Sequence, residues 1–176
     1  MQKNPQLLTT HHFTRISEKA PGILPISAHI HDNNGINSGG EGLNRHVERI
    51  AQILQTLTET SPAYKNPIGF RLTPLLLEMD WAIQHINHLL QQQTNHKDHL
   101  KPYISVLYRA DEAADPLIHG WERAAKWMES PEYPEIVKRR ELYHFLREEL
   151  KSLVPYVEKI FGKEEARFII PPLFRG

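Results

Sequence analysis

Histidine is the residue type in this sequence with the greatest capacity for chemistry. The chain has 176 residues, with eleven histidines and no cysteine. The missing cysteines exclude disulfide bonds, a thiolate metal site and a cysteine nucleophile. The candidates for a metal site are therefore groups of histidines, and two such groups have a spacing that suits ligation of a divalent metal ion.

The first group is the segment His29-Ile30-His31-Asp32. In an extended segment alternate residues share one face, so His29 and His31 would point to the same side, as ligands in many metal sites do. A simpler interpretation is a polar turn after Ile30 that contains two histidines. The pattern leaves both interpretations open and names His29 and His31 as candidate metal ligands.

The second group lies on one face of a predicted helix, where Glu78, Trp81, His85, His88 and Gln92 follow one another at steps of three or four residues. His85 and His88 could share a cation. No carboxylate falls between them as it does in the HExxH motif of metalloproteases, so their further ligands are unspecified. The alternative is a polar face that water solvates or a neighbour binds.

A third arrangement would place a metal site inside a helix bundle. His85 and His88 would then be completed by a residue from another helix, such as His119 or His144. This hypothesis requires the four side chains to converge in space.

Charge and composition exclude several classes of protein. Lys plus Arg equals Asp plus Glu at 21 each, so general binding to nucleic acid is not expected, and the one short basic run, Lys138-Arg139-Arg140, is flanked by glutamates. The longest aliphatic run, Leu75-Leu76-Leu77, is too short to span a bilayer, and no apolar signal segment follows Met1. We expect a protein without a membrane anchor, located in the cytoplasm.

The first 42 residues differ in character from the rest of the chain. Prolines and clusters of Asn, Gly and Ser typical of turns recur in them, at Pro5, Pro21, Pro25, residues 32–35 and residues 38–42. Residues 23–30 could form a short strand, which Pro25 would confine to a sheet edge. The sequence predicts an irregular, loop-rich N-terminal arm at residues 1–42 and a helical domain at residues 43–176.

Two amphipathic helices are predicted at the start of the helical domain. The first covers residues 43–60, with apolar side chains at steps of three and four at Leu43, Val47, Ile50, Leu54 and Leu57. The second covers residues 73–92, because Thr73 suits an N-cap and Pro74 suits the first helical position. Its apolar stripe consists of Leu72, Leu76, Met79, Ile83, Ile86 and Leu90. We expect the two helices to pack as an antiparallel pair.

Further helices complete the prediction. One covers residues 98–110, and another begins at Asp115-Pro116, which repeats the signal of a cap followed by proline. The longest covers residues 135–161, and Pro155 would kink it or divide it into two. The expected fold is mainly α, a bundle of about five helices behind the irregular arm.

The C-terminal tail is apolar and contains two prolines. Gly162 is placed as the C-cap of the preceding helix, and residues 167–174 are not expected to continue it. Apolar side chains in this tail would be a liability if exposed, so we expect them to dock on the core or on a partner. The candidate partner-binding residues are Phe168, Ile169, Ile170, Leu173 and Phe174.

One part of the sequence resembles a known family. The segment 29–35, the run Gly40-Glu41-Gly42, a helix, and then Pro74-Leu75-Leu76-Leu77-Glu78 resemble in order the last two β/α units of xylose-isomerase-like sugar phosphate isomerase barrels. The resemblance covers about residues 26–92. It implies that His29 or His31 and Glu78 are metal ligands, with the glycine run near the substrate.

Two functions are expected from these observations. The first is a non-catalytic helical binding or regulatory protein, which binds a protein partner or associates with itself. The alternative is a metal-dependent, sugar isomerase-like enzyme, or a fragment of one, that uses the His-x-His-Asp motif. The sequence leaves open whether the protein is an enzyme.

Overall fold

The computed structural model describes residues 38–60, 67–92 and 97–175. Within these ranges the chain forms six helices and no strand. The helices are α3 (Ser38–Glu59), α4 (Pro67–Gln91), α5 (Lys97–Trp127), α6 (Tyr133–Phe161), α7 (Lys163–Ile169) and α8 (Pro172–Arg175). None of these helices is both long enough and apolar enough to cross a membrane.

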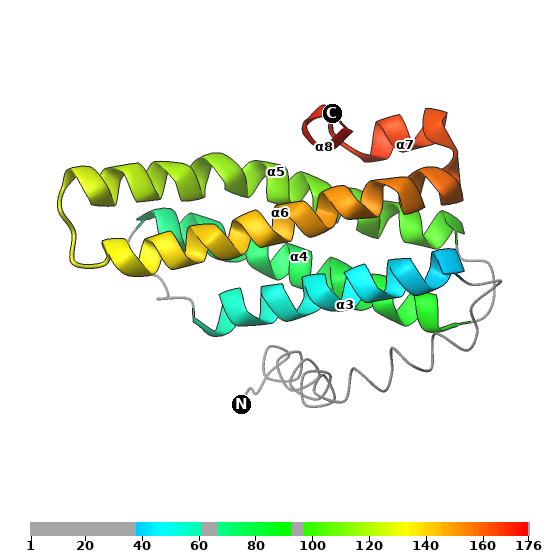
Figure 1. Ribbon diagram of the computed structural model, residues 1–176, viewed down its shortest axis with the longest axis horizontal. Coiled ribbons are helices and arrows are strands. Elements are labelled where there is room, and N and C mark those ends of the chain that lie inside the picture. Colours follow the sequence, from blue (N-terminus) through cyan, green and yellow to red (C-terminus); the bar gives the residue numbers. More distant parts are fainter. Residues whose placement is uncertain (1–37, 61–66, 93–96, 176) are drawn as a thin grey trace.

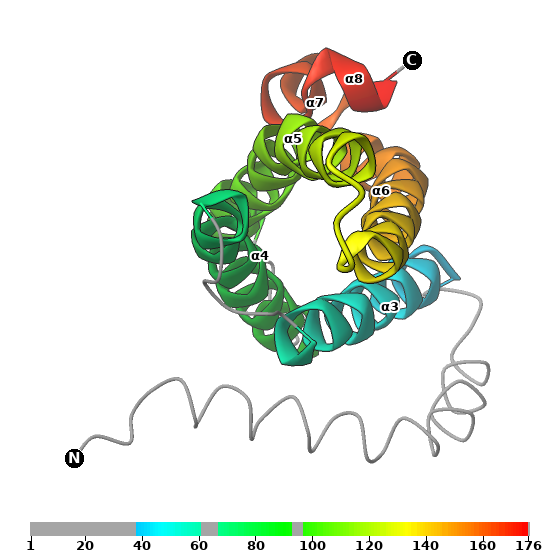
Figure 2. The same cartoon turned by 90° about the vertical axis from the view of Figure 1, so that its left-hand side faces the viewer.

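The four long helices form a ring in which each helix runs antiparallel to the next (Figures 1 and 2). α3 packs against α4 and α6, and α5 packs against the same two helices from the other side. The short helices α7 and α8 lie outside the ring, where they pack on α5 and α6 (Figure 2). The predicted fold class, a mainly α helical bundle, is confirmed.

The apolar stripes explain why the ring forms. All five stripe residues of α3 are buried, and so are Leu72, Leu76, Met79, Ile83 and Ile86 of α4. An amphipathic helix is stable only when its apolar stripe is packed against other helices. Four such stripes facing one axis make a continuous core, so no sheet, metal or disulfide is needed to hold the described helices together.

The predicted start of the second helix was wrong. α4 begins at Pro67, and Pro74 lies inside it. The Thr73 hydroxyl is not an N-cap; it donates to the carbonyl oxygen of Gly69 at 3.0 Å, as serine and threonine inside helices often do. The prediction failed because a proline at the first helical position and a proline on the exposed side of a helix look alike in sequence.

The same reason explains a further difference, because α5 continues through Pro116 as one helix although Asp115-Pro116 predicted a new start. α6 also continues through Pro155 as one helix, so Pro155 does not divide it. Pro74, Pro116 and Pro155 are all exposed, so each proline ring faces solvent and the lost backbone hydrogen bond lies on the outer side of the bundle. Residues 38–42, assigned to the N-terminal arm, are the beginning of α3, while residues 1–37 lie outside the described residues.

The C-terminal tail folds back onto the bundle. Gly162 ends α6 as predicted, with a φ of 88° that favours glycine, and its N–H donates to the carbonyl oxygen of Glu158 at 2.7 Å. The tail does not continue α6, as expected, but it forms two short helices of its own. Residues 163–169 form α7, and Pro172 begins α8, where its missing N–H costs nothing.

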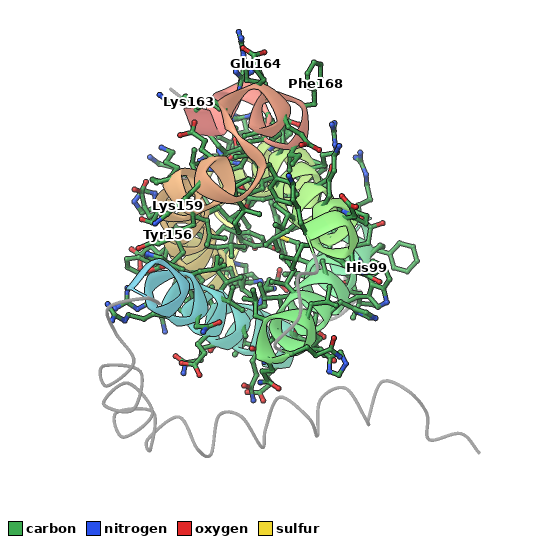
Figure 3. All side chains as sticks on the ribbon, turned by 90° about the vertical axis from the view of Figure 1, so that its right-hand side faces the viewer. His99, Tyr156, Lys159, Lys163, Glu164 and Phe168 are labelled. Atoms are coloured by element: carbon green, nitrogen blue, oxygen red, sulfur yellow. The ribbon has the colours of Figure 1, made fainter. Side chains whose placement is uncertain are left out.

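The apolar side chains of the tail divide into two sets. Ile169, Ile170 and Phe174 are buried against the bundle, so they are not exposed to a partner. Phe168 and Leu173 are exposed, and Figure 3 shows Phe168 pointing away from the ring. The Phe174 ring packs edge-on against Tyr108, with the ring centroids 4.9 Å apart.

Three charged side chains are buried among the described residues, namely Asp80, Asp111 and Arg139. The Arg139 guanidinium donates to the carbonyl oxygen of Leu57 at 3.1 Å and to the Thr60 hydroxyl at 3.0 Å. Carbonyl groups in the last turn of a helix lack partners within the helix. Arg139 therefore joins α6 to the C-terminal end of α3.

Asp80 is buried with few hydrogen bonds to its carboxylate. Its Oδ2 accepts only a long hydrogen bond of 3.4 Å from the Gln84 amide, and its Oδ1 has no hydrogen-bond partner in the described part of the chain. Burial raises the pKa of this carboxyl to about 7, and the contact with Gln84 opposes the rise. Asp80 is therefore mostly protonated below pH 7 and loses its proton close to neutral pH.

Substitution Asp80→Asn should remove part of the pH dependence of stability. In the folded protein the pKa lies above the ordinary value of 3.8, so the free energy of unfolding falls as the pH rises from about 4 to about 8. The full loss is about 4 kcal/mol at most, at about 1.4 kcal/mol per pKa unit. Urea unfolding at pH 5 and pH 8 should show a smaller loss for the variant; an equal loss in both proteins would contradict this role of Asp80.

Phe174 and Phe168 form a matched pair for testing the docked tail. Phe174 is 4% exposed and Phe168 is 77% exposed. Phe174→Ala should lower the free energy of unfolding by about 3 kcal/mol, because it removes a buried aromatic side chain and leaves a cavity. Phe168→Ala should change it by less than about 0.5 kcal/mol. Similar effects of the two substitutions in urea unfolding would show that the tail is not docked in solution.

Candidate functional site

A polar pocket lies between α5 and α6 and has a volume of about 130 Å³. Steps of three and four residues place its side chains on the facing sides of the two helices. We call it the α5–α6 pocket, and its lining consists of Asp111, Asp115 and His119 from α5 with Arg140, Tyr143, His144 and Arg147 from α6.

Arg147 is the central group of the α5–α6 pocket. Its Nε and Nη2 lie 2.9 and 2.8 Å from Oδ2 of Asp111, and Nη2 also donates to the Asp111 carbonyl oxygen at 3.3 Å. Its Nη1 lies 3.2 Å from Oδ1 of Asp115. The guanidinium carbon is 5.2 Å from the centroid of the Phe174 ring, so Arg147 contacts α5 and α8 together.

The other charged groups of the pocket are also paired. The Arg140 guanidinium donates to both carboxylate oxygens of Glu122, at 2.9 and 3.4 Å. The Nδ1 atom of His119 lies 3.0 Å from the carbonyl oxygen of Asp115 and 3.3 Å from its carboxylate. Because both neighbours are acceptors, we place the ring proton of His119 on Nδ1. Its Nε2 atom is then the acceptor that remains for a ligand.

Burial and charge act in opposite directions on Asp111. Burial raises its pKa to about 6 and Asp115 adds to the rise, whereas the Arg147 guanidinium lowers it. Tyr143 is buried in the same region, and burial raises the pKa of its phenol, which stays neutral. The neighbouring Arg139 guanidinium opposes this rise in the pKa of Tyr143. The pocket could therefore hold a small polar molecule, but its arginines are already neutralised by carboxylates of the chain.

A second candidate surface is the outward side of α4. We call it the α4 outer face, and it consists of the exposed residues Phe70, Arg71, Pro74, Leu77, Glu78 and Trp81. Phe70 is 62% exposed, Leu77 is 41% exposed and Trp81 is 50% exposed. Soluble proteins seldom gather large apolar side chains on the outer side of one helix, and such patches mark interaction sites.

Aromatic contacts with α5 fix Trp81 at one end of this face. The Trp81 ring lies 5.1 Å from the Tyr103 ring and 4.8 Å from the His85 ring, measured between centroids. His85 stacks on Tyr103 at 4.7 Å with an interplanar angle of 16°, and its Nδ1 lies 2.8 Å from the Trp81 carbonyl oxygen. His85 therefore serves as a packing and hydrogen-bonding group at the junction of α4 and α5.

The other residues that the sequence predicted as metal ligands are spread over α4, α5 and α6. Glu78 is exposed on α4, and His88, also exposed, lies with its Nε2 atom 3.0 Å from the Gln92 amide. His119 and His144 both line the α5–α6 pocket, whose lining does not include His85 or His88. The four histidines of the third metal hypothesis are thus not brought together.

Within the described residues, no group of three or more His, Asp or Glu side chains is arranged to hold a metal ion. His29 and His31 lie outside those residues, so the metal site formed by them and Glu78 stays a prediction.

Sequence reasoning missed both the α5–α6 pocket and the α4 outer face. The pocket had a detectable signal, since Asp111, Asp115 and His119 recur every four residues on α5, opposite Arg140 and Arg147 on α6. The outer face also had a signal. Leu77 and Trp81 fall on the opposite side of α4 from the predicted apolar stripe, but the sequence prediction counted Trp81 as part of a polar face with Glu78 and the histidines and did not assign Leu77 to that face.

Removal of Arg147 should destabilise the protein in a manner that depends on pH. Arg147→Ala leaves the buried Asp111 carboxylate without its cation, which should lower the free energy of unfolding by about 3 kcal/mol at pH 8. The loss should be smaller at pH 5, where Asp111 can be protonated. Arg167→Ala, an exposed site on α7, is the matched control. Equal losses at both pH values in urea unfolding would contradict the role given to Asp111.

The α5–α6 pocket is thus an internal network of paired charges, and the α4 outer face is an exposed apolar face supported by an aromatic cluster. Neither feature requires a cofactor for its explanation. Compared with known proteins, the chain matches no family model, no curated protein and no solved structure.

Proposed function

We propose that this chain is a non-catalytic binding protein that recognises a protein partner, either a different protein or a second copy of itself, through the α4 outer face. The observation that supports the proposal most directly is the half-exposed Trp81 at the end of a row with Leu77 and Phe70. Tryptophan and tyrosine are enriched among the residues that contribute most to protein–protein binding. Tyr103 and His85 hold the Trp81 ring in place, so binding costs little side-chain entropy.

One exposed apolar side chain on another helix, Phe145, supports the choice of α4 by contrast. Phe145 on α6 has charged or polar neighbours one turn away, at Glu141 and Glu148, and stands alone on its face. Single exposed apolar residues of this kind are common and need no function. On α4 three large apolar side chains share one face within about three turns.

The paired charges of the α5–α6 pocket support a non-catalytic function. A general acid or base needs a proton to give or accept, and a substrate anion needs an unpaired cation. Arg140 and Arg147 are each bound to carboxylates of the chain itself. The compartment that we propose is the cytoplasm, in line with a chain that contains no cysteine.

The metal-dependent, isomerase-like enzyme remains the alternative proposal, through His29, His31 and Glu78. Its test is metal binding by the purified full chain. Calorimetric titration with zinc, manganese and cobalt should then show one site per chain, and binding should be lost in Glu78→Gln; a chain that binds none of the three ions would contradict this alternative.

Substitutions on α4 and α6 test the binding surface. A protein that co-purifies with the chain from extracts of the source cells would be purified and titrated against three variants. Trp81→Ala should weaken binding by about 2 kcal/mol, or about thirty-fold, because a well-packed tryptophan anchor is lost. Leu77→Asp should weaken it at least as much, because it places a charge in an apolar contact.

Phe145→Asp is the matched control, since it makes the same kind of change at an exposed apolar residue of α6. It should leave the affinity within about two-fold of the original value, as surface substitutions outside a contact usually do. Circular dichroism would verify that all three variants are folded. A partner that binds Leu77→Asp and Trp81→Ala as tightly as the original chain would contradict the proposed function.

A further inference from the structure

We infer that the partner of the α4 outer face is a second copy of this chain, bound with the two α4 helices antiparallel about a two-fold axis near Pro74. The inference rests on the proposed function and adds the identity of the partner. It follows from the positions of two charged and two apolar side chains around Pro74, which make this face complementary to itself.

The first step is the arrangement of side chains around α4. At about 100° per residue, Phe70 and Leu77 lie on one side of a line through Pro74 and Trp81, and Arg71 and Glu78 lie on the other side. All of these residues are exposed, whereas Leu72, Leu76, Met79 and Ile83 on the opposite side of the helix are buried. The α4 outer face therefore has an apolar edge and a charged edge.

The second step is the position of these residues along the helix axis. At about 1.5 Å per residue, Arg71 lies about 4.5 Å before Pro74 and Glu78 about 6 Å after it. Phe70 and Leu77 lie about 6 Å before and about 4.5 Å after the same residue. Each edge thus has two members at nearly equal distances from Pro74, one in each direction.

The third step is the choice of orientation. A two-fold axis through Pro74 that makes the helices antiparallel places the charged edge of one copy against the charged edge of the other, and the apolar edge against the apolar edge. It also reverses the order of residues along the helix. It places Arg71 of one copy opposite Glu78 of the other, twice, and Leu77 opposite Phe70, twice. A parallel pair would instead place the charged edge against the apolar edge. Only the antiparallel arrangement matches charge with opposite charge and apolar with apolar.

Arg71 and Glu78 are available for such contacts. Neither side chain takes part in an ion pair within the described part of the chain, and both are exposed. No oppositely charged residue lies three or four positions from either of them on α4, where helix-surface ion pairs normally form. Two unpaired charges of opposite sign on the rim of an apolar face are a pattern that favours one partner orientation over others.

The size of the face predicts a weak dimer. α4 has 25 residues, so it is roughly 37 Å long at about 1.5 Å per residue. A contact between two single helices is smaller than the roughly 800 Å² per partner of a standard stable interface. We therefore expect association that depends on protein concentration in the micromolar range.

Charge reversal on the full chain tests the inference, with sedimentation equilibrium as the measurement. Arg71→Glu and Glu78→Arg should each weaken dimerisation about ten-fold or more, because like charges then face each other at two symmetric contacts. A one-to-one mixture of these two variants should restore the original affinity, because one chain now presents two carboxylates and the other two guanidinium groups. The double variant Arg71→Glu, Glu78→Arg should also restore it.

The possible results separate this inference from the proposed function. Single variants that dimerise normally, or a mixture that fails to recover, would overturn the antiparallel arrangement. An original chain that is monomeric at several hundred micromolar would overturn self-association. The proposed function would still be judged separately, by the titration of Leu77→Asp and Trp81→Ala against a co-purifying protein. Because all the substituted residues are exposed, circular dichroism is expected to show unchanged folding.

Discussion

In a ring of four helices each helix contacts two neighbours, and only the side chains that point into the ring are removed from water. This constraint gives each helix one buried stripe and leaves its opposite face to the solvent. α3 obeys it, with Leu43, Val47, Ile50, Leu54 and Leu57 all buried. α4 has a buried stripe of the same kind, but it also places Leu77, Trp81 and Phe70 on the outer side. The ring leaves Leu77 and Trp81 exposed, which is why we propose that a partner binds at this face.

Polar contacts hold the ring in register and do not by themselves indicate a function. Arg139 connects α6 to the end of α3 through Leu57 and Thr60, and Arg147 connects α6 to α5 through Asp111 and Asp115. A buried ion pair costs desolvation energy for both partners, so its presence is weak evidence for a gain in stability. The Phe174 ring beside Arg147 extends this connection to the C-terminal tail. The charged cluster between α5 and α6 is therefore explained by the fold before any ligand is considered.

The fold could be predicted from apolar spacing, whereas helix boundaries and the candidate site could not. A stripe such as Leu72, Leu76 and Met79 determines which side of a helix is buried. The burial of these stripes determines that the helices assemble into a bundle. Pro74 and Pro116 misled the prediction because sequence does not show whether a proline begins a helix or faces solvent within it. The contact between Arg147 and Asp111 joins residues 36 positions apart, so it depends on which helices become neighbours. Trp81 was noticed as part of a polar face, but its exposure is known only once Tyr103 and α5 are placed beside it.

The most direct test of the central claim is nuclear magnetic resonance mapping of the protein in its associated state, from backbone and indole chemical shifts. We predict that the largest changes on association fall on α4 between Phe70 and Trp81 and on the neighbouring Tyr103, while residues around Phe145 on α6 and Phe168 on α7 stay unchanged. Changes centred on Phe145, on Phe168 or on the pocket around Arg147, with α4 unaffected, would contradict it.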